Sequence, residues 1–238
     1  MYGVYVSTPP APSPRPRLDR DRVVDTAINL ADEQGLTAAS MRGVAERLNV
    51  TPMALYKHVA SHSELVDHML DRVIDTFPDA RSGEDWVQTT RARILAARTA
   101  FAAHPWAREA IETRTLATPR TLHHMDSLMA GMFEGGLSAD LVHHTMHALS
   151  TRMWGFTRDV LPTPQAPADP EERALAMTAF AASYPAIVQM ATTSDHAGEA
   201  CDDDAEFSFA LDLILVGAQR LHERGWTRAT PVQRGLTD

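Results

Sequence analysis

The segment from Ser40 to His62, which reads SMRGVAERLNVTPMALYKHVASH, contains side chains of the types that contact nucleic acids. Hydroxyl, aromatic and basic groups occur between Thr51 and His62, and no carboxylate lies among them. Hydroxyl, phenol and ammonium groups bind phosphate oxygens, whereas the planar fork of an arginine such as Arg42 can bind the edge of guanine. Double-stranded DNA is therefore the first candidate partner of this segment.

Two short helices joined by a tight turn are predicted to position these side chains, at about residues 40–59. Ser40 is a suitable cap for the first helix, Asn49-Val50 suits the turn, and Thr51 with Pro52 suits the start of the second helix. Such a pair is a helix-turn-helix, whose second helix enters the major groove. On this pattern alone, a helix pair that serves only as a packing corner remains an alternative.

The rest of the chain predicts an all-α fold with two domains. Ala-rich segments carry apolar residues three and four positions apart, and alternating β-branched runs are absent. We expect a Pro-rich flexible arm at 1–17, a helix-turn-helix DNA-binding domain at 18–77, a larger C-terminal helical dimerisation and ligand-binding domain at 78–225, and a tail at 226–238. Helices of the larger domain are expected at 84–103, 106–116, 120–134, 138–160, 171–192 and 204–224.

Charge and composition limit the classes of function. The net charge is −9, with −2 in residues 1–76 and −7 in the remainder. This balance argues against coating nucleic acid along the whole surface, but it allows a local basic face. The single cysteine, Cys201, rules out an internal disulfide and fits a reducing cytoplasm. No run of about 18 apolar residues occurs, so we expect a cytoplasmic protein with no membrane span.

Residues 19–77 resemble the DNA-binding domain of the tetracycline-repressor (TetR) family of transcriptional regulators. The resemblance rests on the runs Glu33-Gln34-Gly35-Leu36, Ser40 to Ala45, Leu48-Asn49-Val50 and above all Leu55-Tyr56-Lys57-His58-Val59 followed by Glu64-Leu65. Asn49 stands where glycine is commoner in the family, and asparagine also adopts the left-handed conformation. Residue types and resemblance together give these candidate DNA contacts: Ser40, Arg42, Thr51, Pro52, Met53, Ala54, Tyr56, Lys57, His58 and His62.

The segment 204–224 is apolar on nearly every side and predicts a helix that needs cover all round. Its run from Phe207 to Gly217 resembles the closing helix of the tetracycline-repressor type of C-terminal domain. The resemblance implies a homodimer through the helices near 138–160 and 204–224. Gly217 in mid-helix costs about 1 kcal/mol relative to alanine, which a closely approaching helix would explain. A purely internal core helix is the alternative.

Methionine, aromatic, histidine and arginine side chains in the middle of the chain suit a cavity for a mainly apolar molecule with a few polar handles. Such stripes also form ordinary cores, but the resemblance implies that their helices line an effector cavity. The candidate ligand-binding residues are Trp106, Arg114, His123, Met125, Met132, His143, His147, Met153, Trp154 and Arg158. The family's tetracycline sensor has a metal-contacting histidine before a proline. Glu112-Thr113-Arg114-Thr115 ahead of Pro119 lacks one here, so tetracycline–magnesium is not expected as effector.

His143 and His147 are four residues apart, a spacing that can place two imidazoles on one metal ion. No HExxH pattern and no nearby carboxylate completes a catalytic set. The sequence thus predicts a non-enzymatic DNA-binding transcriptional regulator with no cofactor or bound metal, a repressor released from a palindromic operator by a small molecule. A helical metalloenzyme built on His143, His144 and His147, and a DNA-binding protein that senses no effector, remain the alternatives.

Overall fold

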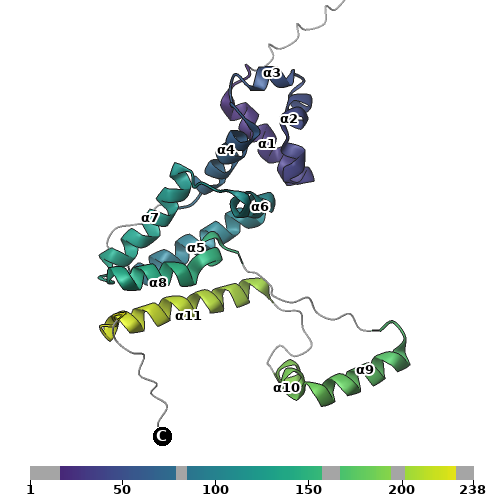
Figure 1. The fold of residues 1–238 in the computed structure, drawn as a ribbon, viewed down its shortest axis with the longest axis vertical. Coiled ribbons are helices and arrows are strands. Elements are labelled where there is room, and N and C mark those ends of the chain that lie inside the picture. Colours follow the sequence, from purple (N-terminus) through teal and green to yellow (C-terminus); the bar gives the residue numbers. More distant parts are fainter. Residues whose placement is uncertain (1–16, 79–84, 157–166, 194–201, 229–238) are drawn as a thin grey trace, which may run out of the picture. The chain divides into compact units, whose positions relative to one another are not determined.

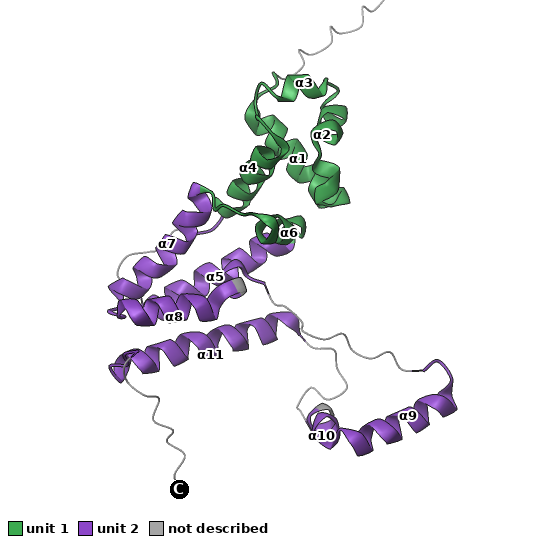
Figure 2. Cartoon of the chain, viewed as in Figure 1, with its two compact units in different colours: residues 1–75, 103–118 green, residues 76–102, 119–238 purple. Residues whose placement is uncertain are grey.

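The computed structural model describes residues 17–78, 85–156, 167–193 and 202–228, and in these ranges every regular element is a helix (Figure 1). The chain divides into two compact units (Figure 2). The first unit comprises residues 1–75 and 103–118, and the second comprises residues 76–102 and 119–238. The backbone therefore passes between the units three times.

The first unit contains α1 and the helix-turn-helix that follows it in the sequence. The helices of this unit are α1 (Arg20–Gln34), η1 (Leu36–Ala39), α2 (Met41–Leu48), α3 (Pro52–Leu55), α4 (His62–Ile74) and α6 (Trp106–Thr113). Asp19 caps α1 by accepting a hydrogen bond from the backbone N–H of Arg22 at 2.9 Å. Gly35 ends the helix at φ +85°, a conformation that favours glycine. The apolar face of α1 is buried, with Val23 and Ala27 fully inaccessible.

The turn after α2 depends on backbone conformation and close packing. Ser40 caps α2 as predicted, because its Oγ accepts from the backbone N–H of Gly43 at 3.1 Å. A Cβ on Gly43 would lie 2.3 Å from the carbonyl oxygen of Ala38, so η1 and α2 can approach this closely only at a glycine. Asn49 ends α2 in the left-handed region at φ 54° and ψ 49°, as expected for this turn.

The helix α3, the second helix of the predicted pair, is short. It spans four residues, after which the backbone N–H of His58 bonds the carbonyl of Leu55 at 2.8 Å, a tighter bond than that of an α-helix. Pro52 occupies the first turn as predicted, but the Thr51 hydroxyl makes no capping hydrogen bond. Val59 then enters the core with 1% exposure, which closes the turn before α4 begins.

Residues 103–118 lie in the first unit, although the sequence placed them in the C-terminal domain. The indole Nε1 of Trp106 donates to Asp32 on α1 at 2.7 Å. Arg114 Nη1 donates to Asp67 on α4 at 2.8 Å. The domain boundary expected at residue 77 stays a prediction, but these contacts bind residues 103–118 to two helices of the first unit.

The second unit contains the longer helices. They are α5 (Trp86–Ala103), α7 (Pro119–Glu134), α8 (Ala139–Leu149), η2 (Ser150–Trp154), α9 (Pro170–Ser183), α10 (Pro185–Thr193) and α11 (Asp203–Glu223). α8 and α11 pack side by side (Figure 1). Ile94 of α5, Leu128 of α7, Leu149 of α8 and Leu215 of α11 are at most 1% exposed and supply its core.

Two of the helices expected in the second unit are interrupted. The helix predicted over 138–160 ends at Leu149, because Ser150 adopts φ 34° and ψ −114° and starts the short helix η2. The helix predicted over 171–192 is split into α9 and α10 at Tyr184–Pro185, because proline has no N–H for an internal helical bond. No helix among the described residues is long and apolar enough to cross a membrane.

Candidate nucleic-acid interface

The short helix α3 and the turn that follows it present polar and apolar side chains to solvent from a fixed backbone. Leu55 and Val59 anchor this segment in the core with 0% and 1% exposure. Met53 is 72% exposed and Tyr56 is 46% exposed, so both project away from the core. Of the residues predicted to contact DNA, Met53 and Tyr56 therefore lie on the outward face of this segment.

The ten predicted DNA contacts fall on three neighbouring stretches of the first unit: the start of α2, the segment from Thr51 to His58, and the start of α4. Seven of the ten are exposed, whereas Ser40, Ala54 and His58 are half-buried, and the Ser40 Oγ caps α2. His62 is the first residue of α4, which Ser61 caps by accepting from Glu64 N–H at 3.1 Å. Their contacts with DNA stay a prediction.

Arginines of the first unit differ in which nitrogens they commit to protein partners. Arg42 donates Nε to Glu46 Oε1 at 2.9 Å along the exposed face of α2, and this hydrogen bond raises the pKa of Arg42. Arg47 instead donates both terminal nitrogens to Glu33, at 3.1 and 2.6 Å. That pairing lowers the pKa of Glu33 below its ordinary value. Arg72 likewise uses both terminal nitrogens, on Asp25 and Asp21.

Arg20 belongs to the same surface, and the sequence reasoning missed it. Its Nε donates to the carbonyl oxygen of His58 at 3.1 Å, which ties the first turn of α1 to the turn after α3. This contact brings a guanidinium next to the backbone of His58, one of the predicted DNA contacts. The two partners are 38 residues apart, so no local sequence pattern could indicate the contact.

A buried hydrogen-bond network occupies the interior of the second unit. Arg93 Nε donates to His124 Nδ1 at 3.2 Å, and His124 Nε2 lies 3.0 Å from the carbonyl oxygen of Met153. Since a carbonyl can only accept, His124 carries its proton on Nε2 and accepts at Nδ1 as a neutral imidazole. Burial lowers the pKa of His124 to about 4, so the ring stays neutral at ordinary pH.

Aromatic rings surround His124 and form, with it, the aromatic cluster of Phe77, Phe101, His124, Trp154 and Phe156. Ring centroids of Phe77 and Trp154 lie 5.0 and 4.8 Å from that of His124. Phe101 contacts Phe77, Trp154 and Phe156 at 5.6, 6.3 and 5.1 Å. Arg93 also donates to the carbonyl of Pro78, so the cluster joins residues 77–78 to α5, α7 and η2.

The predicted ligand-binding residues do not gather in one place. Met132, Met153 and Trp154 are buried in the second unit, whereas His123, His143 and His147 are exposed and Met125 is half-buried. Trp106 and Arg114 belong to the first unit. Arg158 lies outside the described residues. His124 is not among the predicted ligand-binding residues, but it is a buried polar residue of the second unit. The sequence signals its burial, because His124, Leu128 and Met132 follow one another at four-residue spacing on the buried face of α7.

A surface pocket of about 400 Å³ lies between α5 and α11, and none of the predicted ligand-binding residues lines it. Its lining residues are Leu95, Arg98, Thr99, Ala102, Asp204 and Ser208. Arg98 spans it by donating to Asp204 at 2.7 Å and to the carbonyls of Gly155 and Asp203 at 3.0 Å. The arginine is therefore occupied by protein acceptors.

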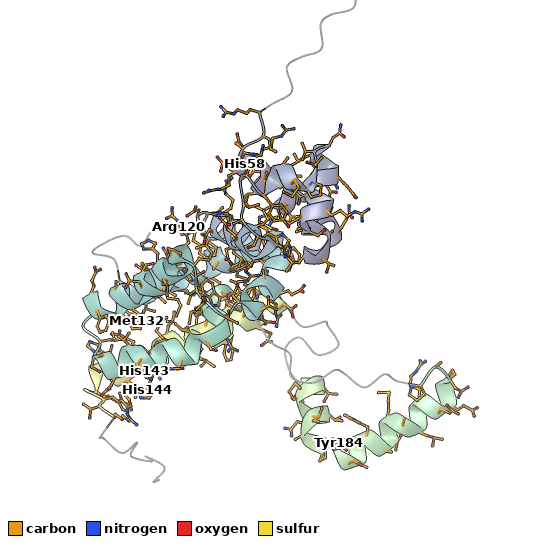
Figure 3. The ribbon with its side chains drawn as sticks, turned by 45° about the horizontal axis from the view of Figure 1, so that its top comes forward. His58, Arg120, Met132, His143, His144 and Tyr184 are labelled. Carbon is orange, nitrogen blue, oxygen red and sulfur yellow. The ribbon has the colours of Figure 1, made fainter. Side chains whose placement is uncertain are left out.

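The three histidines of α8, His143, His144 and His147, are exposed, and Figure 3 shows His143 and His144. Ring centroids of His143 and His147 are 4.5 Å apart, and those of His143 and His144 are 5.3 Å apart. His144 also contacts Trp226 at 5.5 Å. Across the described ranges, no group of three or more His, Cys, Asp or Glu side chains is arranged to hold a metal ion.

The helix α11 has an apolar stripe that its own unit leaves exposed. Phe209, Leu213 and Val216 are 63%, 60% and 44% exposed, while Phe207 and Leu211 on the opposite face are buried. A Cβ on Gly217 would meet no described atom within 4 Å, so no helix among the described residues explains this glycine. The described part of the chain therefore leaves the stripe of α11 uncovered.

Comparisons with known proteins agree on one family. Residues 23–69 match the model of bacterial regulatory proteins of the tetR family, and residues 77–221 match the tetracyclin repressor-like C-terminal domain. Tetracycline repressor protein class C of Escherichia coli is 29% identical over 210 residues, which cover 86% of this chain and 92% of that protein. The HTH-type transcriptional repressor DrrR1 of Streptomyces coeruleorubidus is 32% identical over 131 residues, 54% of this chain and 48% of that protein.

Solved structures show the same fold over most of the chain. A possible TetR family transcriptional regulator from Streptomyces coelicolor A3(2) aligns with a TM-score of 0.65 and 27% identity, over 85% of this chain and 100% of that one. The TetR family protein ActR of Streptomyces coelicolor, in complex with (S)-DNPA, aligns with a TM-score of 0.64 and 26% identity, over 85% of this chain and 98% of ActR.

An all-α fold with an N-terminal helix-turn-helix and a helical C-terminal domain defines a class of bacterial regulatory proteins. The chain belongs to the tetR family. It spans about half the length of two curated relatives that it matches, DrrR1 and an HTH-type transcriptional regulator of Saccharopolyspora erythraea.

Proposed function

We propose that this protein is a transcriptional repressor that binds a palindromic DNA operator as a homodimer and releases it when a small molecule binds the second unit. The observation that carries the proposal is the segment from Thr51 to His58, whose anchors are buried and whose outward side chains are exposed. No carboxylate lies between Glu46 and Glu64, so this face does not repel phosphates.

In this proposal, some side chains contact DNA phosphates and others contact base edges. Tyr56 and Lys57 are exposed and suit phosphate oxygens, which set the register of the protein on the duplex. Arg42 has its terminal nitrogens available for guanine, and the exposed Met53 suits a thymine methyl. Arg20 adds a further phosphate contact at the edge of the surface.

The proposed dimer forms through α8 and α11. Three large apolar side chains of α11 are exposed to solvent, as is typical of a protein–protein interface. The open position at Gly217 allows a partner helix to approach closely. We call the segment from Ser40 to Ser63 the reader. A two-fold dimer carries two readers, which matches a palindrome whose half-sites lie about one helical turn apart. The relatives named repressors support the assignment of a repressor.

Effector binding would act on the spacing between the two readers. ActR is solved in complexes with (S)-DNPA and with actinorhodin, and by this likeness the second unit is the candidate receptor for an organic molecule. An effector can release DNA only if it binds one reader spacing more tightly than the other. Residues 103–118 offer a route, since they continue directly from α5 and are bonded to α1 and α4.

A gel-shift titration with the DNA immediately upstream of the protein's own gene tests the proposal. Arg42→Ala and Tyr56→Ala should each weaken specific binding by about tenfold or more. Arg108→Ala, which removes an exposed arginine from α6, is the matched control and should bind like the wild type. A thermal-shift screen then identifies effectors, and an effector that stabilises the protein without weakening operator binding would contradict the release step.

A further inference from the structure

We propose that Glu46 is a positioning residue that holds the guanidinium of Arg42 in one orientation and thereby makes the reader selective for guanine at a single base pair of each half-site. The inference rests on the proposed function, because it assigns Arg42 to a base contact. Its observation is the hydrogen bond from Arg42 Nε to Glu46 Oε1 at 2.9 Å. The two side chains lie one turn apart on α2 and are 85% and 66% exposed.

The ion pair leaves one geometry for reading guanine. A guanidinium can present two parallel N–H groups either from its end, through both Nη atoms, or from its side, through Nε and one Nη. Glu46 occupies Nε, so the side approach is blocked and the end fork remains for the O6 and N7 acceptors of guanine. Among the described residues, neither Nη atom of Arg42 has another partner.

Neighbouring arginines show the contrast. Arg47 donates hydrogen bonds from both Nη atoms to Glu33, and Arg72 donates from both to Asp25 and Asp21. Neither arginine therefore has its two Nη atoms available for a base. Arg42 is held by a carboxylate through Nε alone. Arg42 thus combines a guanidinium fixed by a carboxylate with an open end fork, which neither Arg47 nor Arg72 does.

The negative charge of Glu46 is unfavourable for DNA binding, which argues against a role in solubility alone. A carboxylate beside a DNA-binding arginine repels the phosphates of every duplex, whatever its sequence. The remainder of the reader, from Arg47 to Ser63, contains no other carboxylate. Glu46 therefore lowers affinity for all DNA, and discrimination between sequences is the benefit that we assign to it.

The test uses the full-length protein with duplexes recovered by in vitro selection and with single-base-pair variants of them. Glu46→Ala and Glu46→Gln are compared with the wild type by fluorescence anisotropy at two salt concentrations. Glu33→Gln is the control, because it neutralises a carboxylate of another exposed arginine pair in the same unit. A circular dichroism melt checks folding, and Glu46→Gln preserves side-chain shape should Glu46→Ala fail to fold.

Glu46→Ala should tighten binding to random DNA and reduce discrimination at one guanine-containing base pair per half-site by about fivefold or more at both salt concentrations. The loss of discrimination should vanish in an Arg42→Ala background, and Glu33→Gln should leave it intact. Equal tightening on all duplexes with unchanged discrimination would overturn the inference while leaving the proposed function standing. A wild-type protein that selects no duplex would overturn both.

Discussion

Asp32 is the acceptor that binds residues 103–118 to α1, and replacing it should measurably destabilise the first unit. Its Oδ1 accepts from Trp106 Nε1 at 2.7 Å and from His104 Nδ1 at 2.8 Å. Trp106 is 4% exposed, so Asp32→Ala leaves a buried indole N–H without an acceptor. Such a loss costs about 1–3 kcal/mol, and because this acceptor is charged we expect about 2 kcal/mol.

Urea denaturation followed by far-ultraviolet circular dichroism measures this cost. Asp32→Asn keeps an oxygen acceptor and should cost less than half as much as Asp32→Ala. Trp106→Phe removes the donor, so Asp32→Ala introduced into that background should cost at least about 1 kcal/mol less than in the wild type. An Asp32→Ala variant as stable as the wild type, or equally costly with and without Trp106, would refute the reasoning.

Three further predictions concern the turn, the buried histidine and the α11 stripe. Asn49→Val should destabilise the protein by about 1–2 kcal/mol in a urea titration, because a β-branched residue is strained at φ 54°, whereas Asn49→Gly should be neutral or stabilising; a tolerated valine would contradict this. Burial lowers the pKa of His124 from 6.5 to about 4, so the unfolded chain binds a proton that the folded chain refuses as pH falls from 6.5 to 4. The wild type should therefore lose about 3 kcal/mol more stability than His124→Gln across this window, and parallel pH profiles would contradict the assignment. Leu213→Glu, which places a charge in the exposed stripe, should shift the protein to monomers in light scattering, with Leu116→Glu on an exposed residue of the first unit as control; a Leu213→Glu variant that stays dimeric would exclude this face.

The reader was predictable because its signals are local. Ser40, Asn49 and Pro52 specify a cap, a left-handed turn and a first helical turn within a few residues of the chain, and the structure has all three. The true end of α3 at Leu55 was not predictable, because the tight bond from His58 depends on how Val59 enters the core.

The interior of the second unit was predicted less well because its contacts are not local. Apolar periodicity identifies which helix face is buried, but it does not tell which helices that face meets. Trp106, which the sequence grouped with the ligand-binding residues of the C-terminal domain, lies in the first unit and bonds Asp32, 74 residues away. The break at Pro185 was visible in the sequence, since proline interrupts helices, whereas the break at Ser150 depends on a backbone conformation that no residue type signals.

The proposed DNA reading is tested most directly by footprinting the purified protein on a duplex recovered by in vitro selection, with the binding stoichiometry measured by light scattering. The account predicts two chains per duplex and two protected half-sites related by two-fold symmetry, about one helical turn apart. Arg42→Ala should lose the protection. Equal affinity for selected and random duplexes at physiological salt, or protection by a single chain, would contradict it.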